Sequence, residues 1–151
     1  MKHRMRGFIA LVILGGFGLF IWSGCGGDDD NPVSGNIPKF GAVTGIVTLP
    51  HATKGEVLWA IIDDDADGEE YYAVAWTNCE DYLTYEYLFT HVPVGKYYVY
   101  AGVFIGDSDG PPEKGDLLGY YGTGRTPPNS ANVIIADSDT TLCNITLEVI
   151  P

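Results

Sequence analysis

The chain has 151 residues, with 20 acidic against eight basic side chains and a formal net charge of −12. Such an acidic protein repels phosphate groups, which argues against nucleic acid and anionic lipid as binding partners. Cations, basic proteins and neutral glycans remain as candidate partners.

The first 24 residues have the organisation of a bacterial export signal. A basic start, through Arg6, precedes an uncharged stretch from Gly7 to Trp22 that is shorter than the about 20 apolar residues of a membrane-spanning helix. The following Ser23-Gly24-Cys25 resembles the bacterial lipobox, in which the cysteine is acylated and becomes the mature N-terminus. The resemblance implies a lipid anchor on Cys25 and a place in the cell envelope. In proteobacteria, an acid directly after the lipidated cysteine resembles an inner-membrane retention signal. This chain has Gly26 there, which favours the outer membrane or cell surface in a host with an outer membrane. The alternative to a lipoprotein is an uncleaved membrane anchor.

Cleavage before Cys25 would remove three of the eight basic residues and none of the acidic ones. The remaining chain is therefore more acidic than the whole. Residues 25–41 are rich in glycine and aspartate and read as a lipidated cysteine followed by a flexible linker. We expect one domain, over residues 42–151.

Within this domain, short runs of β-branched and aromatic residues alternate with turns rich in glycine, proline and aspartate. No amphipathic helical period persists over three turns. The pattern predicts an all-β fold, a seven- to eight-stranded antiparallel β-sandwich. In chain order, the predicted strands cover residues 42–49, 56–62, 71–77, 84–90, 96–104, 117–121, 133–136 and 141–149.

Three segments resemble the carboxypeptidase regulatory-like, or transthyretin-like, modules. Residues 43–49 (Val-Thr-Gly-Ile-Val-Thr-Leu) look like their opening strand, and residues 143–147 fit the closing strand. Residues 87–99 are similar to the group's aromatic-x-aromatic…Val-Pro-Ala-Gly-x-Tyr-x-Val signature, with Val94 at the alanine position. The resemblance implies a β-sandwich over most of residues 43–149 and a non-catalytic role.

The sequence lacks a convincing catalytic constellation. Gly106-Asp107-Ser108-Asp109-Gly110 matches the Gly-x-Ser-x-Gly motif, but two prolines follow where a nucleophile elbow needs a helix, and no histidine comes later. The domain has two histidines, His51 and His91, and both are expected on the surface. We therefore expect a protein that is not an enzyme; a hydrolase using paired carboxylates is the rival class.

Two acidic loops are candidate cation sites. Alternating carboxylates and a glycine in residues 63–68 match the start of calcium-binding loops, although the full EF-hand pattern fails. The expected calcium ligands are Asp63, Asp65, Asp67 and Glu69, with Asp107, Asp109 and Asp116 as a weaker second set. Three predicted strands separate the loops, which places them at opposite ends of the sandwich as two sites or none. The alternative for both is a charged surface turn.

The strand at residues 96–104 carries a second candidate site. If Tyr97 and Val99 face the core, Tyr98, Tyr100 and Phe104 share the opposite face, with Leu58 or Tyr71 beside them. These side chains form a candidate binding surface for a protein or a glycan. The alternative is that they are ordinary strand residues, or that a loop covers them.

Cys79 and Cys143 are the two cysteines of the domain. In an oxidising compartment they either form a disulfide or stay as buried thiols. Cys143 alternates in phase with Ile145, Leu147 and Val149, which predicts that it lies on the buried side of its strand.

These features predict a membrane-anchored cell-envelope lipoprotein that acts as a non-catalytic binding or structural module. Its partners are expected to be the membrane, through the lipid, and a protein or glycan of the envelope. The alternative is a calcium-dependent, lectin-like carbohydrate-binding module, in which calcium and the outward tyrosines act together.

Overall fold

The structure, a computed structural model, describes residues 7–8, 38–65, 71–106 and 111–151. Outside the described residues lie the predicted lipidation site, Cys25, and the predicted cation ligands Asp67, Glu69, Asp107 and Asp109. Within the described ranges, no helix is long and apolar enough to cross a membrane.

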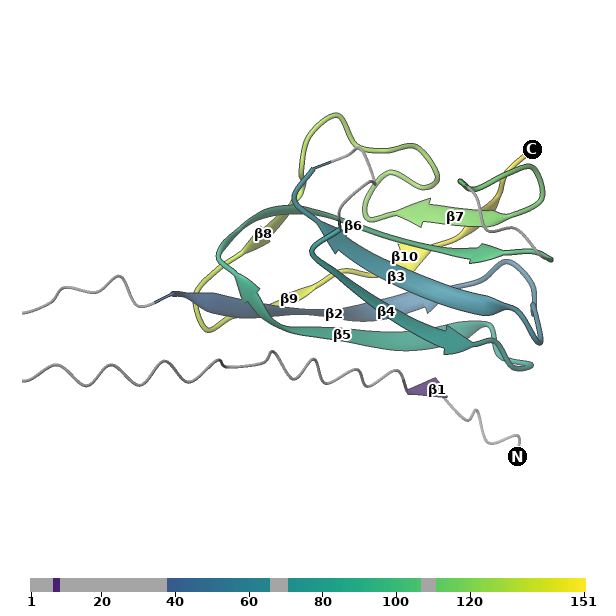
Figure 1. Cartoon of the computed structure of the whole chain (residues 1–151), viewed down its shortest axis with the longest axis horizontal. Helices are drawn as coiled ribbons and strands as arrows, with labels where there is room; N and C mark the ends of the chain where they lie inside the picture. Colours follow the sequence, from purple (N-terminus) through teal and green to yellow (C-terminus); the bar gives the residue numbers. More distant parts are fainter. Residues whose placement is uncertain (1–6, 9–37, 66–70, 107–110) are drawn as a thin grey trace, which may run out of the picture.

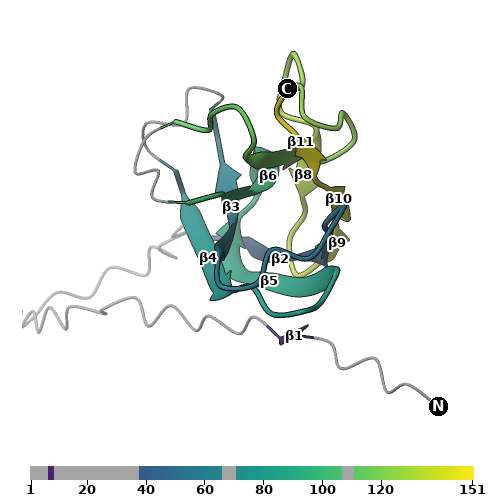
Figure 2. The ribbon, with the colours of Figure 1, turned by 90° about the vertical axis from the view of Figure 1, so that its right-hand side faces the viewer.

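The described residues form two β-sheets (Figure 1). The first contains, in spatial order, β1 (Gly7–Phe8), β5 (Thr84–Pro93) and β2 (Phe40–Thr48), with β9 (Thr140–Leu142) and β10 (Ile145–Thr146) on the far side of β2. The second contains β11 (Glu148–Val149), β7 (Leu117–Tyr120), β6 (Gly95–Phe104), β3 (Val57–Asp63) and β4 (Ala73–Asn78), and β8 (Val133–Ile135) pairs with the start of β6. Viewed along the strands, the sheets form two layers (Figure 2). The prediction of an all-β, two-sheet domain is confirmed.

The core lies between the two sheets and is built by alternating side chains. In β2, Val43 and Val47 point inwards and are fully buried, while Thr44 and Ile46 are half-buried on the outer side. In β3, Leu58 and Ile62 do the same from the second sheet. Burial of each such aliphatic side chain stabilises the fold by about 1.5–3 kcal/mol, so the alternation fixes which face of each strand is available for binding.

The first sheet is mixed, which corrects the prediction of a purely antiparallel sandwich. Both β9 and β10 run parallel to β2. Parallel neighbours need a crossover connection, and the connection from β2 to β9 includes all the strands from β3 to β8. Its last strand, β8, pairs with β6 in the other layer before the chain returns to β2.

The last predicted strand, residues 141–149, is broken into three pieces that serve both layers. β9 and β10 pair with β2, whereas β11 pairs with β7. Cys143, Ile145 and Leu147 are buried as predicted, but Val149 is 43% exposed because the chain has changed sheets before reaching it. The switch closes one side of the sandwich.

A glycine in β2 permits this crossing. A Cβ atom on Gly45 would lie 1.8 Å from the carbonyl oxygen of Cys143. The backbone of the C-terminal segment therefore fills the space that a side chain would take, and the Cys143 N–H donates to the Thr44 carbonyl at 2.8 Å.

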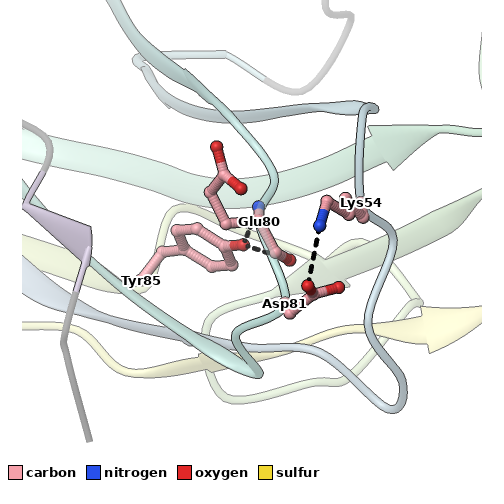
Figure 3. Close-up of polar contacts among 4 residues, drawn as sticks. All are labelled: Lys54, Glu80, Asp81 and Tyr85. Atoms are coloured by element: carbon pink, nitrogen blue, oxygen red, sulfur yellow. Dashed lines mark hydrogen bonds and ion pairs between the residues drawn. The ribbon is translucent and has the colours of Figure 1, made fainter.

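A tyrosine closes the turn between β4 and β5. The Tyr85 hydroxyl accepts a hydrogen bond from the Glu80 N–H at 2.8 Å and donates one to the Glu80 carbonyl at 3.2 Å (Figure 3). Beside it, Lys54 and Asp81 form an ion pair at 2.8 Å between exposed side chains. Exposed pairs contribute little, so the buried ring of Tyr85 is the stabilising part of this turn.

Candidate functional site

The outer face of the second sheet carries aromatic side chains on all four of its longer strands. Trp59 of β3 lies opposite Trp76 of β4 on one side and Gly102 of β6 on the other. Tyr100 of β6 lies opposite Tyr120 of β7. We call this surface the aromatic face and define it by Trp59, Trp76, Tyr98, Tyr100, Phe104 and Tyr120.

Most of the aromatic rings pack on one another, so some of them are shielded from solvent and others are exposed. Tyr100 and Tyr120 stack with centroids 5.2 Å apart, and Trp59 contacts both Phe104, at 5.5 Å, and Tyr100, at 6.0 Å. Trp59 and Tyr100 are each only 9% exposed, whereas Trp76 is 60% exposed. Trp76 is therefore the side chain most available to a partner.

Gly102 shapes the centre of the face. A Cβ atom at this position would lie 2.4 Å from Cζ2 of Trp59. The indole thus lies across the backbone of β6, where any other residue would raise it off the sheet.

The structure places Tyr98, Tyr100 and Phe104 on one face, alternating with the buried Tyr97 and Val99. Tyr98 and Phe104 are half-buried, and Tyr100 is buried. Leu58 and Tyr71 are the two candidates expected next to them. The prediction for Leu58 is wrong, because this side chain is fully buried in the core. Tyr71 is half-exposed just before β4.

Sequence reasoning missed the two tryptophans. Ala73 and Ala75 of β4 point into the core, so the larger Val74 and Trp76 point out. This inverts the usual expectation that large apolar residues face inwards, although the strict alternation of small and large residues was available as a signal.

One end of the aromatic face meets a cluster of three carboxylates. Asp63, Asp64 and Asp65 each offer one oxygen, and these oxygens all lie within 4.8 Å of one another. Asp63 is fully buried, while Asp64 and Asp65 are exposed. The cluster could hold a metal ion, and Asp64, which the alternating motif leaves out, is part of it.

A hydrogen bond joins this cluster to the aromatic face. The Tyr100 hydroxyl donates to Oδ2 of Asp63 at 3.2 Å, and the Asp65 N–H donates to Oδ1 at 3.3 Å. Burial raises the pKa of the Tyr100 hydroxyl, and the Asp63 carboxylate raises it further, because both disfavour a phenolate. Tyr100 is therefore a neutral hydrogen-bond donor at physiological pH.

The second acidic loop is built around Asp116, which is 3% exposed. Its two oxygens accept hydrogen bonds from the backbone N–H groups of Ile105, at 2.8 Å, and Glu113, at 2.7 Å. Asp116 therefore ties the two ends of the loop together. Since Asp63 pairs with Tyr98 and Val57 pairs with Phe104, the two loops leave opposite ends of the sheet.

Cys79 and Cys143 are free thiols in the structure, and both are buried. Burial raises the pKa of the Cys143 thiol to about 11. A protonated thiol is a poor nucleophile, so Cys143 acts as a small core residue.

A shallow cavity of about 430 Å³ lies elsewhere, between Phe40, His91 and Asp139. His91 is exposed and has a φ of 58°, at the point where the pairing of β2 and β5 shifts register. Within the described ranges, the cluster at residues 63–65 is nevertheless the only group of side chains that could hold a metal ion.

The described residues thus join Asp63 to the aromatic face by a hydrogen bond and place Asp65 next to Asp63, and they keep Asp116 at the far end of the sheet. Comparison with known proteins adds no assignment: no family model, no curated protein and no solved structure matches this chain.

Proposed function

We propose that this chain is a membrane-anchored lipoprotein of a bacterial cell envelope that binds a partner, without catalysis, through the aromatic face. The observation that carries the proposal is Trp76, 60% exposed beside Trp59 on a sheet whose other side forms the core. An exposed indole can bury a large apolar area against a partner, and tryptophan and tyrosine are enriched among the residues that dominate binding. If the proposal holds, Trp76→Ala loses binding to components of the cell envelope that the wild type retains.

The proposed domain type is a carboxypeptidase regulatory-like, or transthyretin-like, module. The turn between β5 and β6 supports this assignment, since it contains Pro93 and Gly95 of the quoted signature. Tyr87 and Tyr97 on either side of the turn are buried, and the Tyr97 hydroxyl donates to the Pro93 carbonyl at 3.0 Å.

The proposed anchor is a lipid on Cys25, with the domain at the outer membrane or cell surface. Metabolic labelling with a fatty-acid probe tests it. We expect label on the wild type and on Cys79→Ala, and none on Cys25→Ala, which leaves the membrane fraction or accumulates as an unlipidated precursor. A wild-type chain without label would refute the lipoprotein assignment.

A calcium ion is the cofactor that we propose for the cluster of Asp63, Asp64 and Asp65, with Asp67 and Glu69 as further ligands. Oxygen atoms of carboxylates are the ligands that calcium prefers, and an ion relieves the repulsion between adjacent carboxylates. The hydrogen bond from Tyr100 to Asp63 favours the lectin-like version of the function, in which the ion and the aromatic face serve one ligand. Calcium-dependent thermal stability is the test.

A further inference from the structure

The outer faces of the two sheets differ in a way that strand formation does not explain. On the first sheet, the outward positions of β2 and β5 carry polar and aliphatic side chains, among them Thr44, Ile46, Thr48, Glu86 and Leu88. Their one Phe, Tyr or Trp side chain is Phe40, at the start of β2. On the second, the equivalent positions carry the aromatic face. Tyrosine and tryptophan favour strands in general, but that preference applies to both sheets, so the one-sided concentration of aromatic rings indicates a ligand.

Charge narrows the class of ligand. In β3, β4, β6 and β7 the only acidic residue is Asp63, which is buried, and the only basic residue is Lys96. Lys96 pairs with Ile134 of β8, beyond the end of β7. Away from the carboxylates of residues 63–65 at one end, the aromatic face is thus uncharged on a chain of net charge −12, which disfavours an anionic polymer and offers no ion pair to a charged protein over most of the face.

We infer that the aromatic face binds a neutral polysaccharide, an inference that rests on the proposed binding function. Sugar rings present C–H faces that stack on aromatic rings, and their hydroxyl groups exchange hydrogen bonds with phenols. The half-buried Tyr98 of β6 and Tyr120 of β7 supply phenols on the same face as the exposed indole of Trp76 of β4, so the aromatic side chains are spread across several strands, as an extended sugar chain requires. Because the Trp59 ring lies across Gly102, the centre of the face stays low and suits a flat sugar chain.

Intrinsic fluorescence reports directly on this surface. The chain has three tryptophans; Trp59 and Trp76 both lie on the aromatic face, and Trp22 lies in the predicted signal peptide. A sugar that stacks on the face should therefore change the emission of the domain.

The experiment uses the full-length chain, purified in detergent. Co-sedimentation is measured with microcrystalline cellulose, chitin and insoluble xylan, and fluorescence with soluble oligosaccharides of the same sugars. We expect binding to at least one of them. Trp76→Ala should weaken it at least tenfold, and Trp76→Phe should retain most of it. Leu142→Ala is the matched control, because Leu142 is an equally exposed apolar residue (61%) on the first sheet.

Four results would overturn the inference, and they separate it from the proposed function. Equal loss of binding in Trp76→Ala and Leu142→Ala, or no loss in either, would place the sugar elsewhere. Envelope components that bind wild type but not Trp76→Ala, and that proteinase digestion removes, would show a protein ligand and leave the binding function intact. Binding of neither polysaccharide nor envelope component would refute both.

Discussion

Asp63 and Asp116 are two buried carboxylates at opposite ends of one sheet, each next to an acidic loop, but their hydrogen-bond partners differ. Asp116 gives both oxygens to backbone N–H groups and holds its loop closed. Asp63 accepts one backbone N–H and one phenol, and it has two further carboxylates next to it. The difference teaches that the partner of a buried acid, and not the acidity of its loop, decides between a structural clamp and a candidate ion site.

Removal of the Asp116 carboxylate should have the largest effect on stability. Asp116→Ala leaves two backbone N–H groups without their acceptor, and hydrogen bonds to charged groups contribute about 1.5–3 kcal/mol each. We expect the free energy of unfolding, measured in urea, to fall by about 3 kcal/mol. Asp137→Ala is the control: its side chain is half-exposed and pairs only loosely with Lys39, at 3.6 Å. Equal losses in both variants would show that Asp116 is not a clamp.

The two acidic loops should differ in their contribution to calcium-dependent stability. An ion that binds only the folded chain stabilises it by about 2.7 kcal/mol at a free concentration about 100 times the dissociation constant, which raises the melting temperature by several degrees. Asp63→Asn and Asp65→Asn should each remove most of this shift, whereas Asp107→Asn combined with Asp109→Asn in the other loop should preserve it. If millimolar calcium gives no shift beyond that of magnesium, residues 63–65 are a charged turn.

The smallest expected difference between Asp63 and Asp116 is their effect on the pKa of Tyr100, which alkaline titration measures. The raised pKa of Tyr100 means that the folded chain holds this proton more tightly than the unfolded chain. Its stabilising effect is therefore complete below about pH 10 and is lost as the pH rises further. Asp63→Asn should lower the pKa of Tyr100 but leave it above the ordinary value, because burial is the larger cause. Asp116→Asn should leave it unchanged.

Phenolate absorbance in the ultraviolet follows this titration, and Tyr100→Phe identifies which part of the signal belongs to Tyr100. An unchanged Tyr100 titration in Asp63→Asn would show that the 3.2 Å hydrogen bond between the two side chains does not persist in solution.

The strand alternation was predictable from the sequence because it is a local pattern. Val43 and Val47 indicate the buried side of β2, and Pro93 and Gly95 predict the turn that connects β5 to β6. The break in residues 141–149 was not predictable, since a uniform alternation cannot reveal that hydrogen-bond partners change from β2 to β7.

The candidate site was predictable only in part, for a similar reason. The acidic motif singled out Asp63 and Asp65, but it treated Asp116 as the same kind of residue, because the backbone groups that bind each carboxylate come from the folded loop. Trp76 escaped notice because β4 buries its small residues, Ala73 and Ala75, and exposes a large one, which reverses the usual relation between size and burial.

The place of β2 has a mechanical consequence for an anchored chain. The predicted tether joins the domain at Phe40, the first residue of β2, and β2 is hydrogen-bonded to β5 along one edge and to β9 and β10 along the other. Hydrogen bonds between antiparallel strands lie perpendicular to the strands, so a pull on the tether along β2 strains many of them at once in shear instead of opening them one by one. The aromatic face is on the other sheet, so a ligand bound there would contact the layer to which the tether is not directly connected.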